Sequence, residues 1–100
     1  MTGSTFAFLA RRDENALEAI RSAVGLAVEN RRVAVFLWGV QLRKAGDEAR
    51  IRDLLEMLYD MEADVFTTNA ADVQAWPFVK HADETDLIRR LAAFDRIVPF

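Results

Sequence analysis

Short apolar runs alternate with amphipathic segments along the whole chain. The runs are too short for helices and are rich in Val, Ile, Phe and Thr, a composition that favours strands. They span Thr5 to Ala10, Val33 to Trp38, Asp64 to Thr67, Phe78 to Lys80 and Ile97 to Phe100. Because strands that alternate with helices are joined by crossovers, the pattern predicts an α/β layered domain with a parallel sheet covered on both faces.

The segment between the first two strands has helical spacing. Asp13 is placed to cap this helix, and the apolar positions after it recur at i, i+3 and i+4. These positions are Ala16, Leu17, Ile20, Val24, Ala27 and Val28. We expect Arg31 and Arg32 to end the helix, because positive charge suits the carbonyl end of its dipole. The next strand is apolar at every position and is therefore expected in the centre of the sheet.

A second helix is predicted after Gly46 and Asp47, with an exposed ion pair between Glu48 and Arg52. Its buried face is expected to hold Ile51, Leu54, Leu55, Leu58 and Met61. A short helical segment, Asn69 to Ala75, should end at Trp76-Pro77, because a residue preceding proline is pushed away from helical geometry.

The last helix is predicted to start at a cap formed by Asp83. The residues expected to point inward from it are Leu87, Ile88, Leu91 and Ala92. Pro99 has no backbone donor, so the final strand is best placed at an edge of the sheet.

Length and charge limit the classes of protein that the chain can represent. One hundred residues form one domain with a thin core, and a net charge of −3 with interspersed signs provides no field that would gather nucleic acid or an anionic membrane. The longest apolar run is far below the roughly 20 residues of a membrane helix. Met1 to Ser4 lack a positive residue, and the chain has no cysteine. We therefore expect a cytoplasmic protein without a secretory leader, a nucleic-acid partner or a membrane partner.

Two segments resemble the DsrE/DsrF-type proteins. The closing sequence Leu91 to Phe100, with an aromatic residue, an aspartate, apolar residues and a final phenylalanine, is similar to the end of that family. The turn Gly39-Val40-Gln41-Leu42 resembles the family's Gly-Val-x-Leu segment. The order of elements also matches over nearly the whole chain, so we expect residues 1–100 to form a single DsrE/DsrF-like domain.

The resemblance implies a three-layer α/β/α sandwich with a mainly parallel five-stranded sheet. It also implies a place in a cytoplasmic sulfur relay, in which relatives pass persulfide sulfur between cysteines within homo- or hetero-oligomers such as DsrEFH and TusBCD. Active relatives carry the sulfur-accepting cysteine just after the third strand, where this chain has Thr67-Thr68-Asn69. Because persulfide transfer needs a thiolate, this polypeptide cannot itself carry the sulfur.

Other catalytic arrangements have little support in the sequence. His81 is the only histidine and has no cysteine partner or regularly spaced carboxylates, so no metal site is expected and a structural histidine is favoured. Ser4 and Ser22 lie near the terminus and inside the first helix, where neither suits a nucleophile. The four glycines are too scattered for a dinucleotide fingerprint or a phosphate loop, and no cofactor is expected.

A ligand, if the protein has one, should bind at the carboxyl ends of the parallel strands. The side chains expected there are Arg11, Arg12, Trp38, Gln41, Thr68, Asn69 and His81. Positive charge and a helix amino terminus at Asp13 favour a small anion. The plainer alternative is a set of solvated loop residues around a vestigial site, with Thr68 and Asn69 capping the next helix.

Large apolar side chains provide a second indication. Those that exceed the needs of one thin core are Trp38, Leu42, Met57, Met61, Trp76, Phe78 and Phe94. Such groups are either core residues or subunit contacts. Three hypotheses follow: a cysteine-free, non-catalytic docking subunit that forms a homo-oligomer or joins DsrE-family relatives, a module that binds a small anion or metabolite, and an enzyme that uses His81 as acid or base. The first is preferred.

Overall fold

The computed structural model describes residues 4–100, which form a five-stranded parallel sheet in the order β4-β3-β2-β1-β5. Met1, Thr2 and Gly3, part of the amino-terminal segment considered above, lie outside the described residues. The strands are β1 (Thr5–Ala10), β2 (Arg32–Leu37), β3 (Asp64–Thr67), β4 (Lys80–His81) and β5 (Arg96–Pro99). The helices are α1 (Asp13–Val28), η1 (Leu42–Lys44), α2 (Glu48–Asp60), α3 (Ala70–Ala75) and α4 (Glu84–Leu91).

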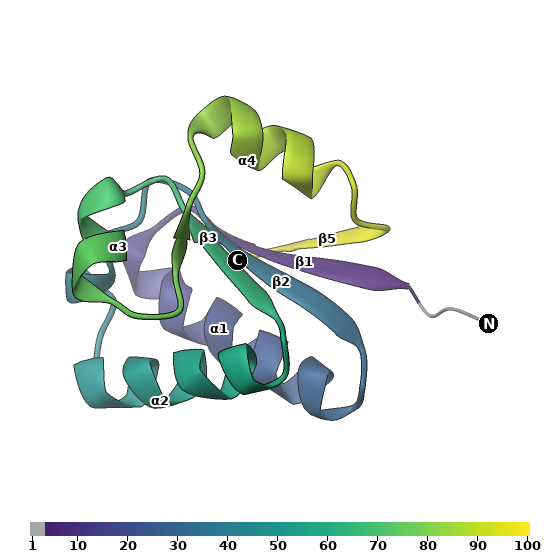
Figure 1. Ribbon diagram of the computed structural model, residues 1–100, viewed down its shortest axis with the longest axis horizontal. Coiled ribbons are helices and arrows are strands. Elements are labelled where there is room, and N and C mark those ends of the chain that lie inside the picture. The colour runs from purple at the N-terminus through teal and green to yellow at the C-terminus, as the bar shows by residue number, and fades with distance from the viewer. Residues whose placement is uncertain (1–3) are drawn as a thin grey trace.

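The predicted three-layer α/β/α fold is confirmed. Helices α1 and α2 cover one face of the sheet, and α4 covers the other (Figure 1). No helix within residues 4–100 is long and apolar enough to cross a membrane.

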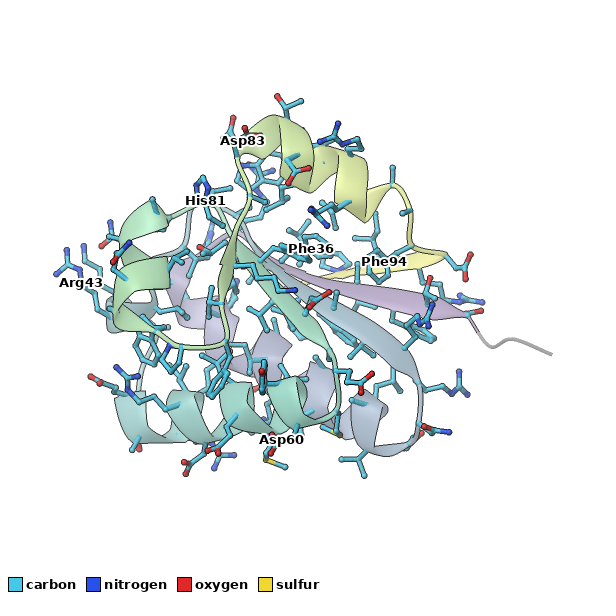
Figure 2. All side chains as sticks on the ribbon, viewed as in Figure 1. Phe36, Arg43, Asp60, His81, Asp83 and Phe94 are labelled. Atoms are coloured by element: carbon cyan, nitrogen blue, oxygen red, sulfur yellow. The ribbon has the colours of Figure 1, made fainter. Side chains whose placement is uncertain are left out.

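The core divides in two because alternate residues of a strand face opposite sides of the sheet. From β2, Val35 and Leu37 pack toward α1 and α2, whereas Phe36 packs toward α4. Phe36 is fully buried and contacts the rings of Phe66 and Phe94, whose centroids lie 5.4 and 5.6 Å from its own. Figure 2 shows Phe36 and Phe94 together between the sheet and α4. The central place predicted for this strand is confirmed by the strand order.

Both ends of α1 differ from the prediction. Its N-cap is Arg12, and Asp13 is the first helical residue with no capping bond to the helix. The helix ends at Val28, before the two arginines that were expected to end it, because Asn30 adopts a left-handed conformation with φ of 65° and the Arg31 N–H donates to Leu26 O. Asparagine tolerates this conformation, which is common after helix ends.

The predicted starts of the next three helices are confirmed. Asp47, Asn69 and Asp83 are the N-caps of α2, α3 and α4, and each side chain accepts a backbone N–H of the first turn. The ion pair between Glu48 and Arg52 also forms, at 3.0 Å.

The edge strands differ in their bounds from the predicted runs. Strand β4 is only two residues long and begins after Phe78, whose φ of 71° is incompatible with a strand. Strand β5 occupies an edge, as Pro99 indicated. The Phe100 N–H donates to Leu9 O at 2.8 Å, so the nitrogen of Pro99, one residue earlier, faces away from β1 and offers no donor to another strand.

Some residues predicted to be buried lie at the surface. Val28 is 65% exposed and Ile88 is 52% exposed, because each lies beyond the contact face of its helix. Ala92 is exposed as well. The expected surplus of large apolar groups is smaller than predicted, since Trp76 and Leu42 are core residues, whereas Phe78 and Met57 are exposed.

Candidate functional site at the carboxyl edge of the sheet

The seven residues predicted to surround a ligand all lie at or just after the carboxyl ends of strands. Arg11 and Arg12 follow β1, Trp38 and Gln41 follow β2, Thr68 and Asn69 follow β3, and His81 ends β4. The connections diverge between β3 and β4. The β3 end leads into α3 and Trp76, which packs with α1 and α2, whereas the β4 end leads into α4 on the opposite face. Ligands of parallel α/β sheets bind at such a divergence.

Three side chains hold the loop that follows β2. Thr68 Oγ1 accepts the Gly39 N–H at 2.8 Å, and Asp13 Oδ1 accepts the Gln41 N–H at 2.7 Å. Asp72 Oδ2 accepts the Leu42 N–H at 3.0 Å. Each bond joins residues about 30 positions apart in the sequence, so the loop is fixed by α1, by the end of β3 and by α3. The buried Leu42 N–H would cost roughly 1–3 kcal/mol without a partner, so its bond to Asp72 stabilises the loop.

The side chains of Thr67-Thr68-Asn69, the segment that the resemblance aligns with the cysteine of active DsrE/DsrF-type proteins, also accept backbone hydrogen bonds. Thr67 is completely buried, and its Oγ1 accepts the Asn69 N–H at 3.0 Å. Asn69 Oδ1 accepts the N–H groups of Ala71 and Asp72 at 3.0 and 3.3 Å. The capping role favoured for Asn69 is therefore confirmed, whereas Thr68 holds Gly39 in place of capping the helix.

Asp72 is the buried carboxyl group of this edge. Burial raises the pKa of the Asp72 carboxyl above its ordinary value of 3.8, partly opposed by the hydrogen bond from Leu42, while Asp13 adds a smaller increase. Asp72 thus keeps this poorly solvated position because its carboxylate accepts the Leu42 N–H of the loop.

The basic side chains at this edge already have neighbours. The Arg11 guanidinium lies over the Trp38 ring, 4.1 Å from its centroid, and Trp38 Nε1 donates to Glu84 Oε2 at 3.0 Å. Arg12 is exposed and lies 3.8 Å from the Glu14 carboxylate. The first turn of α1 also carries Asp13 and Glu14, and such carboxylates oppose an anion at a helix amino terminus.

These carboxylates make a small anion a poor ligand for the edge. A ligand that binds the native state raises Tm with ligand concentration, so a thermal-shift titration detects binding. With phosphate, sulfate, thiosulfate or a nucleotide we expect no such rise, because the carboxylates at this edge oppose an anion. A saturating increase that Arg11→Ala abolishes would contradict this expectation and would support the anion-binding hypothesis.

His81 stands in register with Thr67 and is exposed. Within the part of the chain that the structure describes, no group of three or more His, Asp or Glu residues could hold a metal ion.

The comparisons with known proteins leave the family open. No family model matches the chain, and no curated protein matches its sequence significantly. The resemblance to the DsrE/DsrF-type proteins therefore stays a prediction.

Sequence reasoning missed two acidic residues of this edge, Asp72 and Glu84, and it assigned a third, Asp13, to another role. Asp13 was interpreted as a cap, although its carboxylate accepts a hydrogen bond from a loop 28 residues away. Asp72 and Glu84 carry no local signal for their roles, because each looks like an ordinary acidic residue in the first turn of a helix.

Proposed function

We propose that this chain is a non-catalytic docking subunit of the DsrE/DsrF type. It assembles with a cysteine-bearing relative or with further copies of itself, and it contributes shape to a sulfur-relay oligomer without carrying sulfur. The proposal rests on the predicted resemblance, on the α/β/α fold and on the chemistry of the segment after β3.

The observation that carries the proposal is the use of Thr67, Thr68 and Asn69. Their side-chain oxygens each accept backbone hydrogen bonds that fix the carboxyl edge, at distances of 2.8–3.3 Å. A hydroxyl or amide in this role cannot attack a persulfide, because the nucleophile in sulfur exchange is a thiolate. The segment that the resemblance aligns with the reactive cysteine of DsrE/DsrF-type proteins thus holds the carboxyl edge of this chain in place.

The face covered by α4 is the surface best suited to a partner. One helix covers it, whereas two helices cover the opposite face. A hollow of about 360 Å³ opens beside α4, and its walls include Ala34, Phe66, Ala93 and Phe94. Arg32, Glu62, Asp64 and Arg90 also line the hollow and give its rim both signs of charge. Ala34 and Phe66 are buried, and the Arg90 guanidinium lies 4.5 Å from the Phe66 ring centroid, whereas Ala93 is exposed. An apolar hollow with a mixed polar rim is typical of protein interfaces.

Sedimentation equilibrium tests the proposal directly. We expect the purified protein to form oligomers at micromolar concentration, or to bind a cysteine-bearing DsrE-type protein co-expressed from the same source. A strictly monomeric protein that binds no such relative would contradict the proposal. A labile sulfane adduct on the freshly isolated chain would contradict its non-catalytic part.

Substituting Ala93 by arginine should weaken assembly. Ala93 is exposed on the wall of the hollow, so a long charged side chain there would obstruct a partner without disturbing the core. We expect the dissociation constant of the oligomer to rise by at least about tenfold, since an unmatched charge in an interface costs more than about 1.4 kcal/mol.

Ala92→Arg is the matched control. Ala92 is also exposed but does not line the hollow, so the same change in charge and volume should leave assembly nearly unchanged. Equal weakening by both variants would show that the α4 face is not the docking surface.

A further inference from the structure

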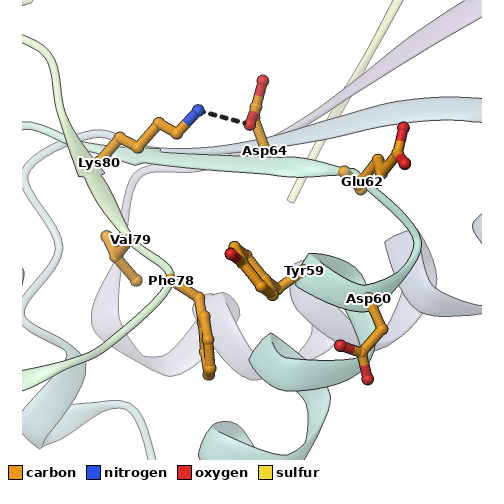
Figure 3. Close-up of a pocket in the computed structure, with 8 residues that line it drawn as sticks. Tyr59, Asp60, Glu62, Asp64, Phe78, Val79 and Lys80 are labelled. Atoms are coloured by element: carbon orange, nitrogen blue, oxygen red, sulfur yellow. Dashed lines mark hydrogen bonds and ion pairs between the residues drawn. The ribbon is translucent and has the colours of Figure 1, made fainter.

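A cavity of about 530 Å³ opens between the carboxyl end of α2, the start of β3 and the segment before β4 (Figure 3). We call it the Tyr59–Phe78 pocket, after the two aromatic residues in its wall. The pocket is separate from the residues at the carboxyl ends of the strands, and neither the sequence nor the proposed function assigns it a role.

The two rings form an exposed aromatic wall. Their centroids lie 4.6 Å apart with the planes inclined by 34°, and the side chains are 60% and 37% exposed for Tyr59 and Phe78. Aromatic rings left in solvent beside a cavity provide a flat apolar contact and a negative π face.

The carboxylates of the pocket outnumber its cations. Asp64 pairs with Lys80, with 2.9 Å between Oδ1 and Nζ, and the figure shows this pair along one side of the pocket (Figure 3). Asp60 and Glu62 also line the pocket, and neither has an ion pair within residues 4–100. The last turn of α2 carries no basic residue, although the carbonyl end of a helix favours a cation. Three carboxylates thus line the pocket with one ammonium group, although Glu62 also borders two neighbouring hollows that contain Arg31, Arg32 and Arg90.

Two residues of the pocket have a strained backbone. Glu62 has φ of 62° and Phe78 has φ of 71°, and they are two of the three non-glycine residues with positive φ in the described chain. Glutamate and phenylalanine are poorly suited to this conformation, which glycine adopts freely. For Glu62 this conformation is the left-handed turn that ends α2, in which the Ala63 N–H donates to Leu58 O at 2.8 Å. Phe78 follows no helix end of this kind, so its strain alone agrees with a binding role for the pocket.

We propose that the Tyr59–Phe78 pocket binds a small organic cation, an ammonium or guanidinium group carried on an apolar body. The apolar body lies against the two rings, and the charged group lies toward the acidic end of α2, where Asp60 and Glu62 extend to opposite sides (Figure 3). The carboxylates disfavour an anion at the same place. The pocket shares Glu62 and Asp64 with the rim of the hollow beside α4, but its two rings and Asp60 lie outside that hollow, and binding there needs no partner chain.

An NMR titration tests the proposal on the whole chain with three probes of similar size. We expect phenethylammonium to give saturable amide shifts centred on Tyr59, Ala63, Phe78 and Val79, and to bind more weakly as salt screens the carboxylates. The neutral 2-phenylethanol should bind about two- to fivefold more weakly, and anionic phenylacetate should bind more weakly still. Equal affinity for the cation and the alcohol, or the absence of saturable shifts at these residues, would overturn the proposal.

Glu62→Gly is the most informative variant. Glycine removes one carboxylate and also relieves the left-handed strain, so affinity for phenethylammonium should fall about two- to fivefold while Tm stays level or rises. This combination excludes simple unfolding as the cause of weaker binding. Tyr59→Leu should weaken cation binding while keeping apolar area, because it removes the π face.

Glu56→Gln provides the control, since it removes an exposed carboxylate of α2 that does not line the pocket. A loss of affinity equal to that of Glu62→Gly would show a general charge effect and overturn the assignment. Cation binding is followed at Tyr59, Phe78 and Val79, which lie outside the hollow beside α4, and assembly is measured separately by sedimentation, so failure of this proposal and failure of the docking role are distinguishable.

Discussion

Replacing Phe36 by alanine is expected to lower the free energy of unfolding by about 3–5 kcal/mol. Phe36 is completely buried in the central strand, and its ring contacts both Phe66 and Phe94. The substitution removes buried apolar area, leaves a cavity under α4 and breaks both aromatic contacts. Because a domain of this size has a total stability of about 5–15 kcal/mol, the substitution should remove a substantial share of it.

Urea denaturation followed by circular dichroism measures this loss. Phe94→Ala serves as the comparison, because Phe94 belongs to the same cluster but is only partly buried, and it should lose clearly less stability. If the two variants lost equal stability, the α4 layer would not be centred on Phe36.

The second large effect is expected at Asp72. Asp72→Ala should lower the free energy of unfolding by about 1–3 kcal/mol, because the buried Leu42 N–H would lose its acceptor. Asp72→Asn keeps an acceptor oxygen without a charge, and it should match or exceed the stability of the unaltered protein at pH 7. The comparison separates the hydrogen bond from the charge.

The free energy of unfolding of the unaltered protein should depend on pH, relative to Asp72→Asn, with a defined sign. Because burial raises the pKa of Asp72 above 3.8, the native state holds this proton more tightly than the unfolded chain does. The stability that the Asp72 carboxyl contributes is therefore fully present below pH 3.8, and it is lost as the pH rises through the pKa of the native state. Urea unfolding at several pH values from about 4 to 7 should show the unaltered protein losing stability relative to Asp72→Asn. A constant difference across that range would contradict the raised pKa.

Much of the fold is present in local sequence patterns. The apolar runs give the positions of all five strands within a few residues, and Asp47, Asn69 and Asp83 mark three helix starts because capping depends on neighbouring residues. Pro99 correctly places its strand at an edge, since the missing donor is a property of the residue itself.

The candidate site was predicted less completely. The sequence places seven residues at the carboxyl edge, and the structure shows the same placement. It does not reveal that Thr68 and Asp72 hold the loop after β2, because those bonds join residues 29 and 30 positions apart. It also gives no sign of the Tyr59–Phe78 pocket, whose walls come from α2 and from the segment before β4.

The sequence by itself determined the alternation of strands and helices, the burial of β2 and the absence of a thiol, because each depends on residue type or on the spacing of near neighbours. Only the tertiary structure decided the strand order, the acceptor role of Asp13 and the meeting of Tyr59 with Phe78. Those features depend on which distant segments pack together, and the balance of burial, hydrogen bonding and chain entropy that selects this packing belongs to the whole domain.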